Sequence, residues 1–240
     1  MDLIFVSGAS SGIGAALTAH LSPIPGLAVA TFSRSELDAP HHLSVDLSNP
    51  AEWSSVAGWM ASVADEVRPT ALRFFHCAAT LNPIGFAGEV DADAYTANVV
   101  LNSASPQVLG GSFIALATRL GVPAVMVQIS SGAATKPYPG WSSYCAAKAA
   151  VDHWTRTVGK ELENRGLPIT VVSVAPGVVE TPMQAEIRGM HESDFPNVQR
   201  FRDLESEGIL RAPEVVAQEL WDLAIRSDLE NGAVLDLRSQ

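Results

Sequence analysis

The feature that most constrains this 240-residue chain is a regular alternation of short apolar runs with longer segments of helical periodicity. The apolar runs lack polar alternation, which is typical of strands that are buried on both faces of a parallel sheet. We therefore predict an α/β fold in which a doubly wound parallel β-sheet is flanked by helices. The predicted strands are 3–6, 28–32, 42–45, 72–75, 124–129, 169–174 and 233–237, and the predicted helices are 13–21, 51–67, 92–120, 143–164 and 213–225.

Composition limits the classes of function that are open to the chain. Hydrophobic residues make up 47% and charged residues 17%, which suffices for the core of one large domain over residues 1–240. A net charge of -11 gives no electrostatic reason to bind nucleic acid or an anionic membrane. Cys77 and Cys145 have no neighbours at metal-ligand spacing, so we expect no metal site, no disulfide framework and a cytoplasmic location.

A glycine-rich turn joins the first predicted strand to the first predicted helix. Its pattern is G-x-x-x-G-x-G, with Gly8 for a tight turn, Gly12 for close approach of a ligand and Gly14 for packing of helix on strand. The N-terminus of the helix supplies N–H donors and the positive end of a dipole. In this strand–turn–helix context the pattern predicts the dinucleotide site of a single-domain Rossmann fold.

The end of the second predicted strand bears on the choice of cofactor. A site for NAD favours an acidic residue there, whereas this chain has Ser33 followed by Arg34. A guanidinium matches the oxygens of a 2′-phosphate, so the sequence predicts NADPH/NADP as the cofactor. The alternative is that Arg34 is a solvated surface residue. Asp46, after the third strand, either accepts from the adenine amino group or caps the helix that follows.

Three residues with acid–base chemistry follow the strand 124–129. Ser131 lies just beyond that strand, and Tyr144 and Lys148 are four residues apart on one helix face. A ketone that accepts a hydride must also gain a proton, which a tyrosine hydroxyl can donate. A lysine ammonium and an oxidised nicotinamide cation beside the phenol would lower its pKa. Ser131 can align the carbonyl oxygen, so the trio predicts reduction of a carbonyl group.

Together these motifs resemble the short-chain dehydrogenase/reductase family over essentially the whole chain. The resemblance includes the glycine loop, the trio and the run Pro176–Thr181. It implies that Tyr144 is the acid/base, that Lys148 binds the nicotinamide ribose, and that Asn102 supports a water-linked proton relay. The cofactor-binding residues are then expected to be Gly8, Ser10, Ser11, Gly12, Ile13, Gly14, Ser33, Arg34, Asp46, Leu47, Ala78, Ala79, Tyr144, Lys148, Pro176, Gly177, Val179 and Thr181.

Two stretches resemble the sepiapterin reductase and bacterial benzil reductase branch of that family. They are Ser130–Ala133 with Gly140-Trp141, and Pro176–Gln184 continuing into Ala185–Arg188. This branch suggests a small-molecule carbonyl substrate, with an aromatic 1,2-diketone such as benzil reduced to a hydroxyketone. A pteridine reductase of the sepiapterin type is the alternative. The family resemblance also implies a homodimer or another homo-oligomer.

The segment after the fourth strand departs from the family pattern. His76-Cys77-Ala78-Ala79 stands where the family has Asn-Asn-Ala-Gly, and Ser7 replaces a more usual threonine. The asparagine side chains that brace the sheet are therefore absent. A nucleophilic dyad of His76 and Cys77 is not expected, because adjacent residues on a strand point to opposite faces.

The expected substrate residues are Ser131, Tyr138, Trp141, Tyr144, Met183 and Asp236. Tyr138 and Trp141 lie in the loop between catalytic residues and either stack on a flat substrate or pack the loop. The segment 181–208 is predicted to be a substrate lid, with an ordinary surface excursion as the alternative. Asp236 either anchors a pterin ring, as the resemblance suggests, or is an ordinary polar residue of the last strand.

Two other classes of function are alternatives to a carbonyl reductase for a chain with this fold. A dinucleotide-binding sensor on the same fold usually lacks the tyrosine or the lysine, and this chain keeps both. An epimerase or dehydratase of the longer branch needs a larger C-terminal substrate region than 240 residues provide. The sequence therefore favours an NADPH-dependent carbonyl reductase.

Overall fold

The computed structural model describes residues 1–239 and confirms the predicted α/β fold. All seven strands pair in parallel in one sheet with the order β3-β2-β1-β4-β5-β6-β7. The order reverses between β1 and β4, so the ligand-binding crevice of such a sheet is expected at the carboxyl ends of these two strands. The strands are β1 (Asp2–Ser7), β2 (Leu27–Ser33), β3 (His42–Ser44), β4 (Ala71–His76), β5 (Ala124–Ile129), β6 (Ile169–Ala175) and β7 (Val234–Asp236).

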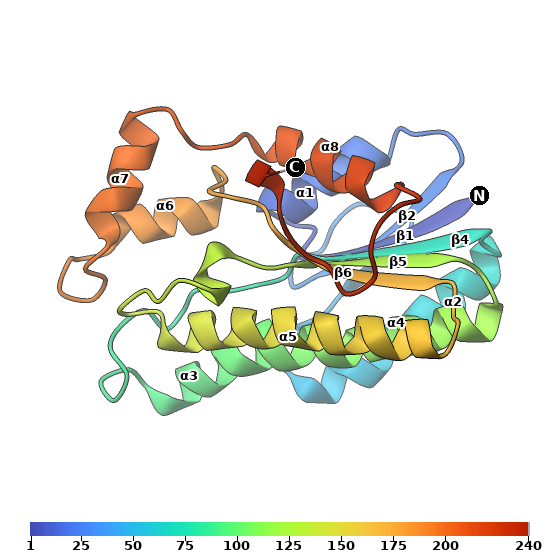
Figure 1. Ribbon diagram of the computed structural model, residues 1–240, viewed down its shortest axis with the longest axis horizontal. Helices are drawn as coiled ribbons and strands as arrows, with labels where there is room; N and C mark the ends of the chain where they lie inside the picture. Colours follow the sequence, from blue (N-terminus) through green and yellow to red (C-terminus); the bar gives the residue numbers. More distant parts are fainter. Residues whose placement is uncertain (240) are drawn as a thin grey trace.

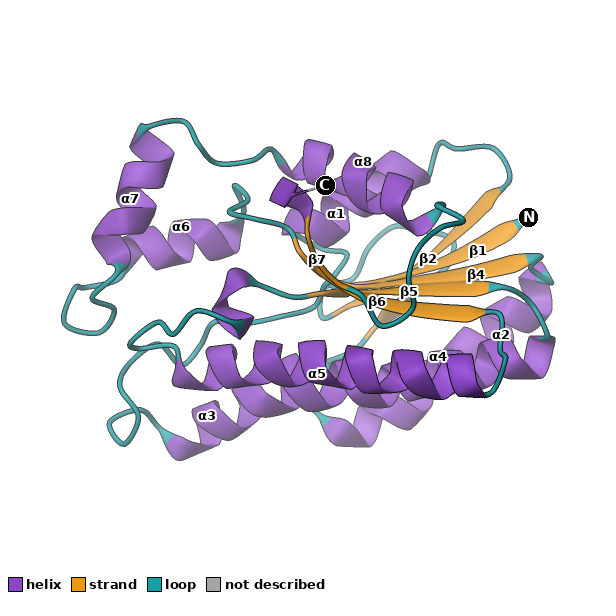
Figure 2. Ribbon diagram, viewed as in Figure 1, coloured by secondary structure: helices purple, strands orange, loops and turns teal. Residues whose placement is uncertain are grey.

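Helices cover both faces of the sheet, as Figures 1 and 2 show. One face carries α1 and α8, and the other carries α2, α4 and α5. Two further helices, α6 and α7, extend beyond the carboxyl edge of the sheet. The helices are α1 (Gly12–Leu21), α2 (Trp53–Val67), α3 (Ala92–Val99), α4 (Ser105–Leu120), α5 (Ser142–Asn164), α6 (Pro182–Gly189), α7 (Val198–Ser206) and α8 (Pro213–Ala224).

The two faces of the sheet form separate hydrophobic cores. On the α1/α8 face, Ile4 and Val6 pack with Leu17 and Leu220. On the other face an aromatic column crosses the sheet, with ring centroids 5.7 Å apart for Phe32 and Phe74 and 5.6 Å apart for Phe74 and Phe113. The central strands β1, β4, β5 and β6 are mostly buried on both faces, so their uninterrupted apolar runs indicate them correctly, whereas the short edge strands β3 and β7 are only partly buried.

The stretch Ala92–Leu120 is long and apolar enough to cross a membrane by length and composition alone. In the fold it is a packing helix, interrupted by a π-helical segment η2 (Val100–Ala104). Leu109 and Phe113 of α4 are fully buried in the core against the sheet. The apolar character of this stretch is therefore explained by its contact with β4 and β5.

A close backbone contact sets the position of α5, the helix that carries Tyr144 and Lys148. A Cβ added at Gly159 would lie 2.4 Å from the Cα of Gly232, in the turn before β7. The same turn is tied to β6 because the Asn231 side chain donates to the Ile169 carbonyl and accepts from the Val171 N–H. No side chain larger than hydrogen fits at Gly159 without moving the helix or the turn.

We predict that Gly159→Ala lowers the free energy of unfolding by about 1–3 kcal/mol, the usual cost of overpacking. The matched control is Gly111→Ala on α4, where an added Cβ meets nothing within 4 Å. That substitution should raise stability by about 0.5–1 kcal/mol through helix propensity. Denaturant unfolding followed by circular dichroism measures both changes. Equal effects of the two substitutions would contradict the close-contact interpretation.

Candidate active site

The glycine loop adopts a conformation that only glycine allows at its first position. Gly8 has φ of +65°, and a Cβ there would lie 2.8 Å from the backbone N and Cα of Ala78. A Cβ at Gly14 would lie 2.3 Å from the carbonyl oxygen of Gly8, so this glycine brings α1 directly onto the loop. The loop is therefore held flat against the end of β4, beside the switch point of the sheet.

The N-terminus of α1 is open to a ligand. Ser11 occupies the N-cap position with extended backbone, and its side chain makes no capping hydrogen bond. The first N–H groups of a helix have no partner within the helix. Together with the helix dipole they form a site suited to the pyrophosphate of a dinucleotide.

The hydroxyl of Ser7 takes over the bracing that the missing asparagines would provide after β4. Its Oγ accepts from the N–H groups of Cys77 at 3.0 Å and Ala78 at 3.2 Å. The Nδ1 atom of His76 lies 3.2 Å from the same oxygen. This buried hydroxyl thus ties the segment that departs from the family pattern to the end of β1, where Ser7 also pairs with His76 in the sheet.

His76 and Cys77 do not form a nucleophilic pair. Cys77 packs against the α1/α8 core, whereas the His76 ring lies 5.6 Å from Phe74 on the opposite face. Burial lowers the pKa of His76 to about 3 and raises the pKa of Cys77 to about 12. The cysteine therefore stays a thiol and the histidine stays neutral at physiological pH.

The end of β2 places Arg34 at the rim of the cavity beside the glycine loop. Its side chain is exposed and makes no ion pair within residues 1–239. The hydroxyl of Ser33 donates to the Ser35 carbonyl at 2.9 Å. Asp46 does not cap the following helical segment, since Asn49 accepts from Ala51 there. The Asp46 Oδ1 atom instead accepts from the N–H and hydroxyl of Ser48, and the carboxylate lines the cavity.

The catalytic trio comes together at the carboxyl end of β5. Ser131 follows β5, while Tyr144 and Lys148 both lie on buried positions of α5. Lys148 donates from Nζ to the Ile129 carbonyl at 2.8 Å, and its Nζ lies 5.6 Å from the centroid of the Tyr144 ring. All three side chains line the same cavity as the glycine loop. The geometry suits proton donation to a carbonyl oxygen held between Ser131 and Tyr144.

The pKa values within the trio are governed first by burial. Burial raises the pKa of Tyr144 to about 12, and the neighbouring Ser131 hydroxyl opposes that rise. Burial lowers the pKa of Lys148 to about 8, and the Asp152 carboxylate opposes that fall. The expected lowering of the tyrosine pKa by the lysine is thus not achieved by the protein's own groups, because the cost of burying a phenolate is larger.

Asn102 lies in the π-helical segment η2 and is buried behind the loop that follows β4. Its side chain accepts from the Thr80 N–H at 3.0 Å and donates to the Thr80 carbonyl at 2.7 Å. It also donates to the Asn98 side chain at 2.9 Å. The amide therefore positions this loop, and the proton-relay role that the resemblance implies stays a prediction.

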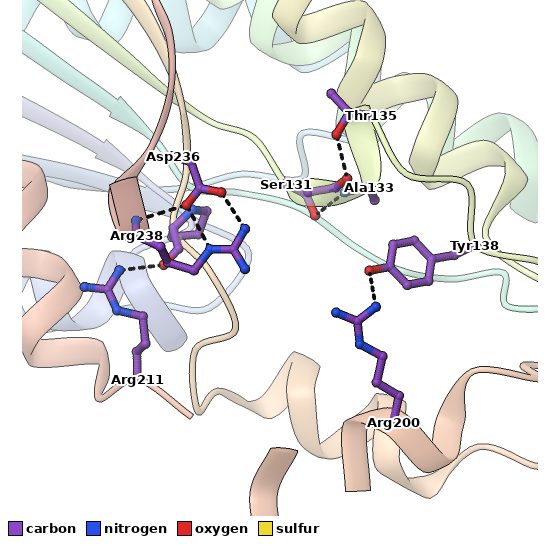
Figure 3. A network of polar contacts seen from close by, with 10 residues as sticks. Ser131, Ala133, Thr135, Tyr138, Arg200, Arg211, Asp236 and Arg238 are labelled. Atoms are coloured by element: carbon purple, nitrogen blue, oxygen red, sulfur yellow. Dashed lines mark hydrogen bonds and ion pairs between the residues drawn. The ribbon is translucent and has the colours of Figure 1, made fainter. Parts of the chain in front are cut away.

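One continuous cavity collects the residues predicted to bind the cofactor and all but one of those predicted to bind the substrate. Asp236 is the exception, because it is absent from the cavity wall. Both of its carboxylate oxygens bond to the Arg238 guanidinium, and this bond lowers the pKa of Asp236 (Figure 3). Asp236 therefore belongs to an ion pair in this structure, and Arg238 occupies the cavity wall in its place.

The substrate end of the cavity has an aromatic wall that we define as Tyr138, Trp141 and Phe201, and the fully buried Phe195 ring packs behind it. Trp141 stacks on Phe195 with centroids 4.3 Å apart and an interplanar angle of 8°. The Trp141 ring also meets the Tyr144 ring edge-on at 5.8 Å. Tyr138 and Trp141 thus do pack their loop, while they also line the cavity beside the proton donor.

Sequence reasoning missed the specific role of Phe201 in this wall and of Phe195 behind it. Phe195 is fully buried between α6 and α7, and Phe201 is a buried residue of α7. Their apolar character within a charged segment was the available signal. Which loop they would cover depends on contacts across some sixty residues of sequence, as the Tyr138–Arg200 contact illustrates with its separation of 62.

A parallel sheet with a glycine loop and a Ser–Tyr–Lys trio at its carboxyl edge defines an oxidoreductase that uses a dinucleotide. A family model described as short chain dehydrogenase matches residues 2–192, and the chain belongs to this family. Its membership and the form of the cavity together support a nicotinamide dinucleotide as cofactor.

Individual relatives agree with this assignment over nearly the full chain. A benzil reductase ((S)-benzoin forming) from Bacillus subtilis is 35% identical over 242 residues, which cover 99% of both chains. Sepiapterin reductase from mouse is 30% identical over 253 residues, covering 96% of this chain and 94% of that protein. A crystal structure of a short chain dehydrogenase/reductase from Saccharomyces cerevisiae superposes with a TM-score of 0.86 at 25% identity, covering 99% and 96% of the two chains.

Asp152 yields a prediction about pH dependence. This buried carboxylate lies one helical turn beyond Lys148, and it accepts from the Ser173 hydroxyl at 2.6 Å. Because Asp152 opposes the fall of the lysine pKa, Asp152→Asn should lower that pKa below about 8. Lys148 then loses its proton at lower pH, so the alkaline limb of the kcat/KM profile for carbonyl reduction should move to lower pH.

The control for this prediction is Ser173→Ala, which removes the hydrogen bond and leaves the negative charge in place. Its alkaline limb should stay where it is in the wild type. Circular dichroism establishes that both variants are folded. An unmoved limb in Asp152→Asn would show that this carboxylate does not sustain the lysine ammonium.

Proposed function

We propose that this oxidoreductase uses NADPH to reduce one carbonyl group of an aromatic 1,2-diketone, such as benzil, to a hydroxyketone. The observation that carries the proposal is the aromatic wall directly beside Tyr144 and Ser131. A flat aryl group stacks favourably in such surroundings, with its adjacent carbonyl within reach of the proton donor. The name of the Bacillus subtilis relative agrees with this substrate class.

The residues of this chain have distinct roles in that reaction. The glycine loop would hold the pyrophosphate of the dinucleotide and Lys148 its nicotinamide ribose, and the bound cofactor would supply a hydride for the carbonyl carbon. Tyr144 gives its hydroxyl proton to the carbonyl oxygen, so the carbonyl becomes an alcohol and the tyrosine becomes a phenolate. Ser131 donates a hydrogen bond to the same oxygen, and the Lys148 ammonium lies where it stabilises the phenolate.

The ion pair of Asp236 favours the diketone over a pteridine. A pteridine offers N–H donors that a free carboxylate could accept. Here the carboxylate is already satisfied by Arg238 and lies outside the cavity wall. A diketone offers only acceptors and apolar surface, which match the aromatic wall and need no such carboxylate.

The contacts of the segment 181–208 support our proposal that it is a substrate lid. It folds into α6 and α7, and Met183, Ile187 and Phe201 from it line the cavity. The assembly into a homodimer or another homo-oligomer, and a cytoplasmic location, stay proposals that rest on the family resemblance and on two cysteines that are both free.

We predict that Tyr144→Phe lowers kcat for benzil by at least about 10²-fold, the range typical of a lost general acid, while NADPH binding is retained. The measurement is the rate of NADPH oxidation with benzil as substrate, followed by the loss of the absorbance of the reduced cofactor. Tyr95→Phe is the matched control, because Tyr95 lies on α3 and is absent from the cavity wall. Near-normal turnover by Tyr144→Phe would reject the assigned mechanism.

The preference for NADPH over NADH depends on Arg34. Arg34→Ala should weaken NADPH binding by about 1.5–3 kcal/mol, the scale of a charge-assisted hydrogen bond. Binding of NADH should change little, because NADH lacks the 2′-phosphate. The affinity for each cofactor is measured by adding NADPH or NADH to the protein and following the change in its intrinsic fluorescence. Equal losses for the two cofactors would show that Arg34 does not contact the phosphate.

A further inference from the structure

The cavity is lined by more positive than negative side chains, although the whole chain has a net negative charge. The chain has 15 lysines and arginines against 26 aspartates and glutamates. Arg34 and Asp46 lie at the glycine-loop end of the cavity, and Lys148 is catalytic. The charged residues that remain in the wall at the substrate end are Lys136, Arg200, Arg238 and Glu186.

Arg200 differs from the other arginines around this end of the cavity. Arg238 pairs with Asp236, Arg211 pairs with Glu219, and Arg188 pairs with Glu180 and Glu205. Arg202 donates to two backbone carbonyls in the last turn of α6 and just beyond it, those of Arg188 and Met190. Within residues 1–239, Arg200 has no carboxylate partner.

The contact that Arg200 does make points its guanidinium toward the aromatic wall. Its Nη1 atom donates to the Tyr138 hydroxyl at 3.4 Å, as Figure 3 shows. The Tyr138 ring lies 5.1 Å from the Trp141 ring, which in turn lies 5.8 Å from the Tyr144 ring. The wall therefore leads from the proton donor at one end to an unpaired guanidinium at the other.

Lys136 adds a second positive charge to this end. It lies in the loop that carries Tyr138, lines the cavity, and makes no ion pair within the described part of the chain. Among residues 1–239, Glu186 is the one acidic residue of the wall there, and its Oε1 accepts from the Asn82 side chain at 2.6 Å. Two cations without a carboxylate partner against one carboxylate leave a net positive charge at this end, which favours an anionic group on the ligand.

We propose that the preferred substrate is an aromatic diketone that carries a carboxylate on the ring remote from the reacting carbonyl, with Arg200 as the residue that binds this carboxylate. This inference rests on the proposed function and specifies its substrate class. The aryl ring lies along the aromatic wall, so its far substituent reaches the guanidinium. A planar guanidinium binds a carboxylate through two parallel hydrogen bonds, which a neutral ring cannot accept. Lys136 strengthens the attraction as a second charge.

The test compares benzil with benzil-4-carboxylate as substrates for the NADPH-loaded enzyme. In the wild type, kcat/KM should be about tenfold higher for the carboxylate, which corresponds to about 1.4 kcal/mol. Arg200→Gln should bring this ratio close to one, mainly through KM. Added salt should lower the wild-type ratio, because the guanidinium is exposed and screened.

Arg156→Gln is the matched control for loss of one positive charge. Arg156 is an exposed residue of α5 that is absent from the cavity wall and has no ion pair within residues 1–239. Its substrate ratio should equal that of the wild type. A ratio that Arg200→Gln leaves unchanged, with benzil still reduced, overturns the inference while the proposed function stands.

A binding measurement separates the two proposals if neither diketone is reduced. Quenching of tryptophan fluorescence reports binding of benzil-4-carboxylate, because Trp141 lies in the cavity wall. About tenfold weaker binding to Arg200→Gln than to the wild type supports the carboxylate site, even where the proposed reaction fails. Equal affinity of the two proteins overturns the site.

Discussion

The parallel arrangement of the sheet is the constraint on which the site depends. Parallel strands bring all their carboxyl ends to one edge, so β1, β4, β5 and β6 end within one cavity. The glycine loop, the bracing hydroxyl of Ser7 and the catalytic Ser131 each lie at or just beyond a strand end. Such an edge gathers residues from distant parts of the sequence without any one loop having to be long.

Burial then creates an electrostatic problem at the centre of this edge. The same apolar surroundings that exclude water raise the pKa of Tyr144 and lower that of Lys148, which disfavours the phenolate and ammonium forms alike. Asp152 offsets part of the penalty for the lysine, and a positively charged oxidised nicotinamide would offset part of it for the tyrosine. The protein alone thus holds the tyrosine protonated, which is the state a proton donor needs before reduction.

The fold and the central chemistry could be predicted from the sequence because both depend on local patterns. The strand 124–129 was predicted with the bounds it has, and the helix predicted to begin at Ser143 begins at Ser142. The Tyr144–Lys148 spacing fixes a helix face whatever surrounds it. The glycine loop likewise needs only its own backbone geometry.

Side-chain contacts that no periodic pattern indicates could not be predicted in the same way. Asp236 was weighed as a ligand anchor, yet its partner lies two residues away at Arg238, in a 3-10 turn that no periodicity indicates. For Asn102, the sequence does not indicate the two hydrogen bonds that its amide makes with the Thr80 backbone, 22 residues away. No pattern in the sequence indicates a role for Arg200, because Tyr138, the side-chain partner that residues 1–239 provide for it, is 62 residues away.

The residues that carry out the reaction and the residues that select the substrate come from different parts of the fold. Ser131, Tyr144 and Lys148 come from β5 and α5, whose positions are fixed by the core and by the Gly159–Gly232 contact. The segment that forms α6 and α7, beyond the edge of the sheet, contributes Phe201 of the aromatic wall, the Phe195 ring behind it, and Arg200 (Figure 1). That segment contributes nothing to the sheet, so its side chains can change without disturbing the proton donor. A chain of this family can therefore keep one reaction while α7 determines which charge the substrate must carry.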